Sequence, residues 1–364
     1  MPGSQAKAND EFDWPALAHR VLQNRGFTPK HQTLSFDSMI ATDLPKDISL
    51  EDRFRGAIWG QFVGDAAALG THWIYNLTEL RQLYPSGVNG FEAPKEGHYH
   101  FGKKPGDQTH YGDGALVFLE SLAREGRFDA KAFGRSFVEN FTPGVYSGYI
   151  DKATRGTLEN YQAFVESHSI DSFDFQQGAD DDQLAAASRL ASLVVRYWND
   201  PSLLTVVEQA TRVCQNNPRA IAYMKFHALF LSELFAGRDI HSALHRAEEQ
   251  IVSAEPELGE EVRRKTRQAM EETLHEVEQV TLTFGQSCPL ISSFPASIHA
   301  LLKYPDDFES GILATLRAGG DNAGRASMLG AWLGAHHGIN GIPEIWRSRL
   351  SHADRISAAI DKIL

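Results

Sequence analysis

Gly64-Asp65 opens a segment in which an acid, an imidazole and aromatic rings follow one another closely. His72, Trp73 and Tyr75 come shortly after Asp65. Asp65 by itself is explained equally well as the cap of a turn in a tightly packed helix. A titratable ring beside aromatic faces, however, is typical of a ligand pocket. We therefore predict that Asp65, Trp73 and Tyr75 contact a substrate and that His72 carries or orients a proton.

Gly319-Gly320-Asp321 is a second glycine-acid segment and the most specific feature of the chain. Glycines permit positive φ angles and a close approach to a ligand. Asn322 can hydrogen-bond a hydroxyl, and Arg325 can hold a phosphate or carboxylate through two parallel bonds. A plain turn between helices would not need Asp, Asn and Arg together. We expect Asp321 to be an acid-base group and Asn322 and Arg325 to bind substrate.

A third polar segment, Thr109-His110-Tyr111, is followed by Asp113 at the start of a predicted helix. Free backbone amides at a helix N-terminus and nearby side-chain oxygens together suit a binding site. Asp113 as a simple helix cap is the structural alternative, but it leaves His110 and Tyr111 unexplained. We predict acid-base roles for Asp113 and His110, and substrate contacts for Thr109 and Tyr111.

Two further segments carry weaker signals. Asp180, Asp181 and Asp182 precede Gln183 and a helix, where acids usually complement the helix dipole. One carboxylate facing a cleft is the alternative, so Asp182 and Gln183 are candidate substrate contacts. His98-Tyr99-His100 has the spacing of metal ligands. Without nearby cysteines or carboxylates, it favours a surface loop over a zinc site.

Helices must position these residues, because apolar residues recur at spacings of three and four and no alternating strand pattern is present. An acidic first turn at residues 50–53 begins the first core helix, which leads to Gly64-Asp65. Residues 326–337 are small and apolar at nearly every position and predict a buried helix. Residues 85–114 predict a long irregular loop. Further helices are predicted at 115–124, 129–141, 154–164, 183–198, 203–215, 219–235, 242–253, 261–284, 296–303 and 308–316.

These elements predict one compact all-α domain at residues 50–364, preceded by an N-terminal extension at 1–49 with a short helix at 13–26. The formal net charge of −12 disfavours nucleic acid and anionic membranes as partners. There is no apolar run of membrane-spanning length and no apolar signal core. Cys214 and Cys288 favour free thiols in a reducing compartment. We expect a cytoplasmic protein that acts on a small molecule.

The order of these segments resembles the ADP-ribosylglycohydrolase superfamily. That family opens with an Arg-x-x-Gly-Ala helix leading to a Gly-Asp-Ala turn, as Arg53-Phe54-Arg55-Gly56-Ala57 leads to Gly64-Asp65-Ala66 here. It closes with a Gly-Gly-Asp loop, a small-residue helix and an Ile-Pro-x-x-Trp element, matched here by Gly319-Gly320-Asp321, the following helix and Ile342-Pro343-Glu344-Ile345-Trp346. The resemblance implies a compact all-α hydrolase that cleaves the N- or O-glycosidic bond of ADP-ribose.

The resemblance also implies two magnesium ions, which family members hold through a Thr-Asp-Asp-Thr stretch and a final Asp-Thr-Asp-Thr stretch. Magnesium prefers oxygen ligands. Here the first stretch matches Thr109-His110-Tyr111-Gly112 and the last matches Asp321-Asn322-Ala323-Gly324. An early Glu of many relatives falls on His72. Of the family's metal ligands, only Thr109 and Asp321 are retained, and these two would hold a metal if any is bound. The magnesium ligand set is therefore incomplete, and no cofactor is assigned.

The polar replacements are similar to those of the divergent branch that contains the J-crystallins and selenoprotein J. Our leading hypothesis is a hydrolase that cleaves an ADP-ribosyl or related glycosyl bond of a small polar, sugar-like substrate. Asp321 and Asp113 would be its acid and base, with His72 and His110 as proton carriers. The alternative is a catalytically silent ligand-binding or crystallin-like protein on the same fold. A third hypothesis is a conventional magnesium enzyme that uses the acids at 180–182.

Overall fold

The structure is a computed structural model that describes residues 48–272 and 274–364. Within this part of the chain the fold is all-α, as predicted, with isolated bridges but no β-strand. Residues Asp47–Leu364 form one compact unit. No helix in the described part is long and apolar enough to cross a membrane. The predicted N-terminal extension, with its short helix at 13–26, lies outside the described residues.

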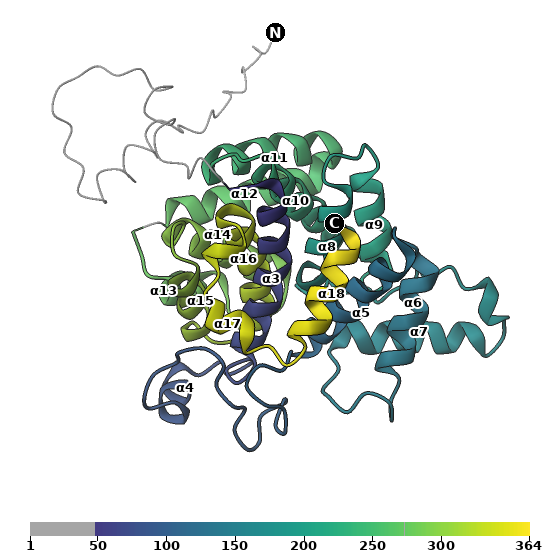
Figure 1. The fold of residues 1–364 in the computed structure, drawn as a ribbon, viewed down its shortest axis with the longest axis horizontal. Helices are drawn as coiled ribbons and strands as arrows, with labels where there is room; N and C mark the ends of the chain where they lie inside the picture. The colour runs from purple at the N-terminus through teal and green to yellow at the C-terminus, as the bar shows by residue number, and fades with distance from the viewer. Residues whose placement is uncertain (1–47, 273) are drawn as a thin grey trace, which may run out of the picture. The chain divides into compact units, whose positions relative to one another are not determined.

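Two helices that are distant in sequence, α3 (Leu50–Ala68) and α16 (Asn322–His337), pack against each other along their lengths (Figure 1). Ser49 caps α3, and α16 is buried on nearly all sides, as predicted. A Cβ on Gly60 would lie 2.0 Å from Gly330 O, and one on Gly56 would lie 2.1 Å from Gly334 O. Glycines at helical spacing thus let the two backbones touch. Because the helices are antiparallel, the end of α3 meets the start of α16.

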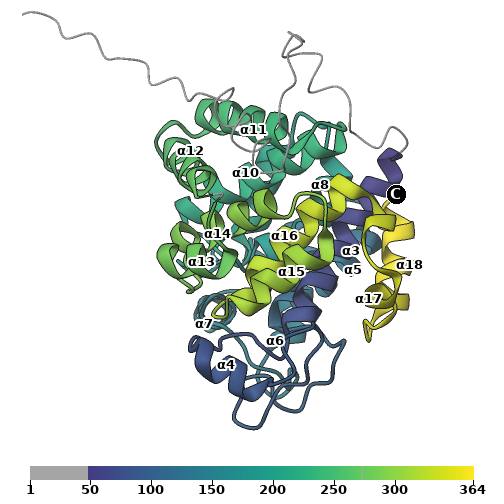
Figure 2. The same ribbon diagram turned by 90° about the vertical axis from the view of Figure 1, so that its left-hand side faces the viewer.

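The other helices surround this pair (Figure 2). α14 (Leu290–Lys303) and α15 (Phe308–Arg317) pack on α16, and α5 (His110–Glu125) packs on α3. Trp332 of α16 is fully buried, and its indole Nε1 donates to His227 Nδ1 at 2.9 Å. The remaining α-helices are α4 (Leu77–Leu83), α6 (Ala130–Phe141), α7 (Lys152–Val165), α8 (Ala191–Tyr197), α9 (Leu203–Arg212), α10 (Pro218–Phe235), α11 (Ile240–Ala254), α12 (Pro256–Glu271), α13 (Val277–Phe284), α17 (Glu344–Ser348) and α18 (Ala353–Ile363).

Three predicted helices differ from those of the structure. The segment 261–284 was expected to be one helix but is divided into α12 and α13. His299 of α14 bonds Glu272 O at 3.1 Å, so a tertiary contact satisfies the end of α12. The segment 183–198 is a 3-10 turn at Ala187–Arg189 followed by α8. α14 begins at Leu290, before the predicted start, because the helix accommodates Pro295.

The long segment between α4 and α5 lies at the same end of the fold as the end of α3 (Figures 1 and 2). It is irregular, as predicted, although residues 110–114 of the predicted loop form the first turn of α5. Specific bonds fasten the segment to the core. Tyr84 OH donates to Gly70 O at 2.6 Å. Arg317 of α15 donates twice to Val88 O, at 3.1 and 2.9 Å. The segment therefore forms an ordered wall beside the end of α3 and the Gly319-Gly320-Asp321 loop.

Candidate functional site

The segment that follows α3 and the second glycine-acid segment are joined directly by backbone hydrogen bonds. Gly64 and Asp65 themselves lie within α3, which continues to Ala68, so the expected end of the helix at this glycine was wrong. Trp73 N donates to Gly320 O at 2.7 Å, and Gly320 N donates to Ile74 O at 2.9 Å. Gly319 and Gly320 both have a φ of +65°, so the predicted need for glycine at this turn is confirmed. Trp73 has a φ of +62°, a conformation that is uncommon for a residue with a side chain. The contact holds His72 and Asp321 next to each other.

Asp65 positions the start of α5 against the end of α3. Its carboxylate accepts hydrogen bonds from Thr109 N at 2.7 Å and from Thr109 Oγ1 at 2.6 Å. Burial raises the pKa of Asp65 to about 6, although the bonds from Thr109 oppose the shift. Thr109 Oγ1 accepts from Tyr111 N at 3.1 Å, so Thr109 caps α5 and the capping role considered for Asp113 was wrong.

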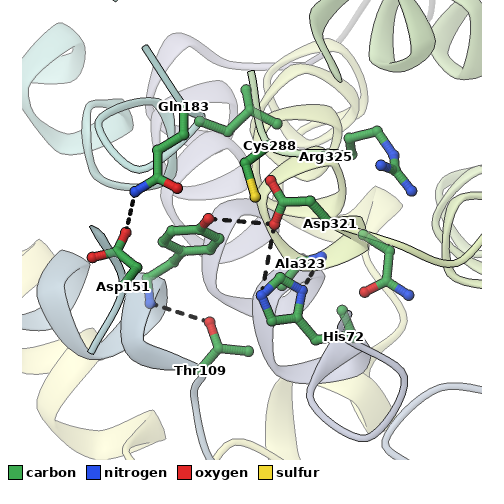
Figure 3. A network of polar contacts seen from close by, with 12 residues as sticks. His72, Thr109, Asp151, Gln183, Cys288, Asp321, Ala323 and Arg325 are labelled. Atoms are coloured by element: carbon green, nitrogen blue, oxygen red, sulfur yellow. Dashed lines mark hydrogen bonds and ion pairs between the residues drawn. The ribbon is translucent and has the colours of Figure 1, made fainter. Parts of the chain in front are cut away.

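Asp321 lies at the centre of a polar network with one carboxylate oxygen uncommitted (Figure 3). Tyr111 OH donates to Asp321 Oδ1 at 3.3 Å, and His72 Nε2 lies 3.6 Å from the same oxygen. Oδ2 has no hydrogen-bond partner, and the side chain makes no capping bond to α16. Burial raises the pKa of Asp321 to about 6, against the opposing charges of Arg325 and His110.

His72 is held in a defined tautomer. Its Nδ1 accepts a hydrogen bond from Ala323 N at 3.3 Å (Figure 3). In the neutral ring the proton is therefore on Nε2, the nitrogen that faces Asp321. Burial, together with the neighbouring His100 and His110, lowers the pKa of His72 well below its usual value, so the ring is uncharged at neutral pH.

Three buried histidines meet beside Asp321: His72, His100 and His110. One ring nitrogen of each lies within 4.8 Å of those of the other two. The expectation of a surface loop at His98-Tyr99-His100 was wrong for His100, which is 2% exposed. His98 fastens this turn, because its Nδ1 accepts from His100 N at 3.0 Å and its Nε2 bonds His72 O at 2.7 Å.

Asp151, which the sequence analysis missed, lies on the other side of His110. It is fully buried, caps α7 through Thr154 N at 2.7 Å, and has its Oδ2 3.6 Å from His110 Nε2. Gln183, a predicted site residue, donates to the same oxygen (Figure 3). Burial tends to raise the pKa of Asp151, but the nearby His110 ring and the bond from Thr154 outweigh it and lower the pKa. An Asp-x-x-Thr pattern reads as a helix cap, so the sequence held no further signal.

Asn322 and Arg325 bond to the fold itself. Asn322 Nδ2 donates to Thr71 Oγ1 at 2.9 Å. Arg325 is 1% exposed, and its guanidinium donates to Gln286 O at 3.1 Å and to Gly319 O. These bonds shape the second glycine-acid loop. The substrate contacts expected of both residues stay predictions.

Asp113 and Asp182 occur in ion pairs and do not bond to the histidines. Asp113 Oδ2 accepts from Lys103 Nζ at 2.5 Å and Tyr146 OH at 2.6 Å, in the wall of a cavity of about 230 Å³. Asp182 Oδ2 pairs with Arg219 at 3.1 Å. The acid-base role of Asp113 and the substrate contact of Asp182 stay predictions that these pairings do not support.

An aromatic cover, formed by Trp73, Tyr99 and Tyr149, lies over the histidines. The three rings contact one another with centroids 4.9–5.2 Å apart, and Trp73 stacks on His72 at 4.2 Å. Tyr99 is 59% exposed and Tyr75 is 45% exposed, whereas Asp321 has no exposed surface. Asp321 is therefore closed to solvent in this structure, with the aromatic cover over the histidines beside it.

The residues present do not fit the two magnesium ions of the resemblance. Magnesium needs several oxygen ligands around each ion. Both Asp65 oxygens are bonded to Thr109, and Asp321 is the one acid of its stretch. In the described part of the chain, the one convergent group of three His, Cys, Asp or Glu residues consists of imidazoles. The donor set is therefore nitrogen where magnesium requires oxygen.

Comparisons with known proteins agree with this fold. The family model described as ADP-ribosylglycohydrolase matches residues 46–364. Crystallin J1A of Tripedalia cystophora is 26% identical over 316 residues, which cover 84% of this chain and 94% of the crystallin. Crystallin J1B of the same animal is 26% identical over 308 residues, 82% and 92% of the two chains. A solved structure titled "ADP-ribosylglycohydrolase-related protein complex" superimposes with a TM-score of 0.62 at 23% identity, covering 86% of this chain and 98% of its own.

Proposed function

Because this chain belongs to the ADP-ribosylglycohydrolase family, we propose that it is a hydrolase that cleaves an ADP-ribosyl or related N- or O-glycosidic bond of a small polar substrate. Its acid-base chemistry uses Asp321 and its neighbours in place of the magnesium carboxylates of the resemblance. It works in the cytoplasm and takes a small molecule, with neither nucleic acid nor a membrane as partner.

The uncommitted carboxylate oxygen of Asp321 carries the proposal. Buried polar atoms are almost always hydrogen-bonded, because leaving them without a partner costs about 1–3 kcal/mol. Asp321 Oδ2 has no partner although the side chain is fully buried. An aspartate that neither caps its helix nor forms a close ion pair contributes little to the fold. A group that reacts with a bound substrate explains this arrangement.

The neighbours of Asp321 fit a general acid-base role. Tyr111 OH and His72 Nε2 both approach Oδ1 and hold the carboxyl in one orientation, with Oδ2 free. In hydrolysis, the water bonds to the anomeric carbon as the glycosidic bond breaks. Oδ2 accepts the proton that the water loses and passes it to the leaving nitrogen or oxygen, so the carboxylate is regenerated. A carboxyl pKa raised toward neutrality suits both transfers.

The aromatic cover supplies the binding surface. The faces of Trp73, Tyr99 and Tyr149 suit stacking against a sugar or a base. The positive φ of Trp73 is a strained conformation, and such strain is concentrated at sites that move or bind ligands. We infer that substrate displaces this cover and that the closed arrangement is the state without substrate.

Turnover of ADP-ribosyl-arginine, ADP-ribosyl-serine and simpler N-glycosides tests the proposal. Each substrate is incubated with wild-type protein and with Asp321→Asn, with EDTA and without. We expect cleavage of at least one substrate by the wild type and a loss of kcat of about 10²–10⁴-fold in the variant. Glu248→Gln is the matched control, because Glu248 is another buried acid but lies on α11, outside the site.

Equal activity of Asp321→Asn and the wild type would remove Asp321 from the chemistry. Activity that EDTA abolishes and magnesium alone restores would contradict the replacement of the magnesium site. Either result would favour the third hypothesis, a conventional magnesium enzyme that uses the carboxylates at 180–182.

The second candidate function is a ligand-binding or structural protein that kept the fold and lost the reaction. Two observations favour it: the curated relatives are named crystallins, and Asp321 is closed to solvent. Thermal-shift measurements with ADP-ribose and simple sugars separate the two functions. A binding protein is stabilised by its ligand but forms no product, whereas a structural protein shows neither effect.

A further inference from the structure

Three imidazoles from distant parts of the sequence converge in the interior of the protein. His72 follows α3, His100 lies in the long irregular segment, and His110 is the first residue of α5. They are 0%, 2% and 3% exposed, respectively. Three parts of the chain thus bring histidines to one point, where one nitrogen of each lies within 4.8 Å of the others.

The ring nitrogens at this point lack hydrogen-bond partners. His72 Nε2, both nitrogens of His100 and both nitrogens of His110 are buried and unpaired. Each such atom costs about 1–3 kcal/mol unless something else satisfies it, so leaving all of them unpaired is unfavourable. In a core that formed only for stability, apolar side chains would fill this space better.

We propose that His72, His100 and His110 bind one divalent transition-metal ion, of which zinc is the best fit, at the place where the magnesium carboxylates are missing. Neutral imidazole is a preferred ligand of zinc, copper, iron and nickel, whereas magnesium and calcium prefer oxygen. With Zn–N bonds of about 2.0–2.1 Å, the nitrogens of a tetrahedral site lie ~3.4 Å apart. The rings of His100 and His110 make no hydrogen bonds that would oppose this contraction. His72 binds through Nε2 only after the ring proton has moved to Nδ1, and it then gives up the hydrogen bond from Ala323 N.

Two carboxylates flank the cluster and complete the environment of a cation. Asp151 Oδ2 lies 3.6 Å from His110 Nε2 and is held by Thr154 and Gln183. A carboxylate behind a ligating histidine fixes its ring and increases its basicity. Asp321 Oδ1 lies 3.6 Å from His72 Nε2. The two acids offset the charge of the ion, and Asp321 stands where a fourth ligand or a bound water would lie.

Neighbouring residues hold the proposed ligands in place. His98 Nε2 bonds the His72 carbonyl, and this link fixes the distance between the ligands His72 and His100. Trp73 stacks on His72 and Tyr149 lies against His110, with centroids 4.2 and 5.9 Å apart, so aromatic rings exclude water from the site. A water-excluded site with three imidazoles and an open position is typical of zinc sites that bind a further ligand.

Metal analysis of the full-length protein tests this proposal without any measurement of activity, so it can fail while the proposed function holds, and the reverse. The protein is freed of metal with a chelator and titrated with Zn²⁺, Co²⁺ and Mg²⁺. We expect one Zn²⁺ per chain, visible absorption bands with Co²⁺, and no effect of Mg²⁺. Zn²⁺ should also raise the Tm of the metal-free protein.

Variants locate the ion. His100→Ala should weaken zinc binding by at least ~100-fold, and Asp151→Asn by about 10–100-fold as a flanking carboxylate. His336→Gln is the matched control, because His336 is also buried but lies at the far end of α16. Circular dichroism checks folding, and His100→Gln provides a second variant of the same size class if the alanine variant unfolds.

Three results would overturn the proposal. The first is a metal-free protein that binds no zinc at micromolar concentration. The second is a zinc stoichiometry and affinity of folded His100→Ala and His100→Gln equal to those of the wild type, which would place the ion elsewhere. The third is competition of Mg²⁺ with zinc at similar concentrations, which would contradict a nitrogen donor set.

Discussion

Replacing Gly60 with alanine tests the contact between α3 and α16, which brings Asp65 and Asp321 to the same end of the fold. The added Cβ would lie 2.0 Å from Gly330 O, whereas carbon and oxygen normally stay about 3.3 Å apart. The obstructing atom belongs to the backbone, so α3 and α16 must separate by about 1 Å. A backbone atom cannot rotate away, so the cost lies at the upper end of the usual overpacking range, about 3 kcal/mol, and the better helix propensity of alanine returns about 1 kcal/mol. We expect the free energy of unfolding to fall by about 2 kcal/mol.

Thermal unfolding measures this change as a fall in Tm of about 3 °C, because the entropy of unfolding of a domain as large as residues 47–364 is about 0.7 kcal/mol/K. Turnover should fall by more than the loss of folded protein explains, because a displacement of about 1 Å at reacting groups can cost about 100-fold in rate. Gly311→Ala of α15 is the control, since its Cβ would meet only side-chain atoms, at 3.1 and 3.3 Å, and it should melt at or above the wild type. A Gly60→Ala protein with the Tm of the control would refute the argument.

Three other substitutions have expected outcomes. Asp65→Ala removes both acceptors of Thr109 and should lower the free energy of unfolding by about 2–3 kcal/mol in urea unfolding, whereas an unchanged value would show that water replaces them. Glu248 has a pKa raised from 4.5 to about 8 by burial, so its unfolded form loses the proton first and stability falls with pH by about 1.4 kcal/mol per unit across that window. Glu248→Gln should flatten this fall, and an identical pH profile would contradict the raised pKa. Arg325→Lys should lower the Tm by about 4 °C or more, because lysine cannot replace the two guanidinium hydrogen bonds to Gln286 O and Gly319 O. A Tm equal to that of the wild type would mean that stability does not need these two bonds.

The helical part of the fold could be predicted because its signal is local. Residues 326–337 are small and apolar throughout, and only a helix buried on all sides satisfies that pattern. The division of 261–284 into α12 and α13 could not be predicted, because no Pro or Gly marks it. The bond from His299, a residue on another helix, satisfies the broken end.

The place of the site could be predicted, but its composition could not. Asp321 and His72 lie beside glycines whose conformation the turn requires, and such positions can be found along the sequence. His100 and Asp151 reach this site only because the segment before α5 folds back beside the end of α3 and the start of α7 lies against the start of α5. The spacing of His98 and His100 suits metal ligands, but no partner residue lies near them in the sequence, and Asp151 reads as an ordinary helix cap. Neither residue could therefore be placed in the site from the sequence.

A crystal structure with ADP-ribose bound tests the central claim, that the working site lies between the end of α3, with Asp65, and the loop of Asp321. We predict that the ribose lies within hydrogen-bond distance of Asp321 Oδ2, with Trp73 moved from its place over His72. A ligand bound instead in the cavity beside Asp113, with Asp321 still enclosed, would contradict the account.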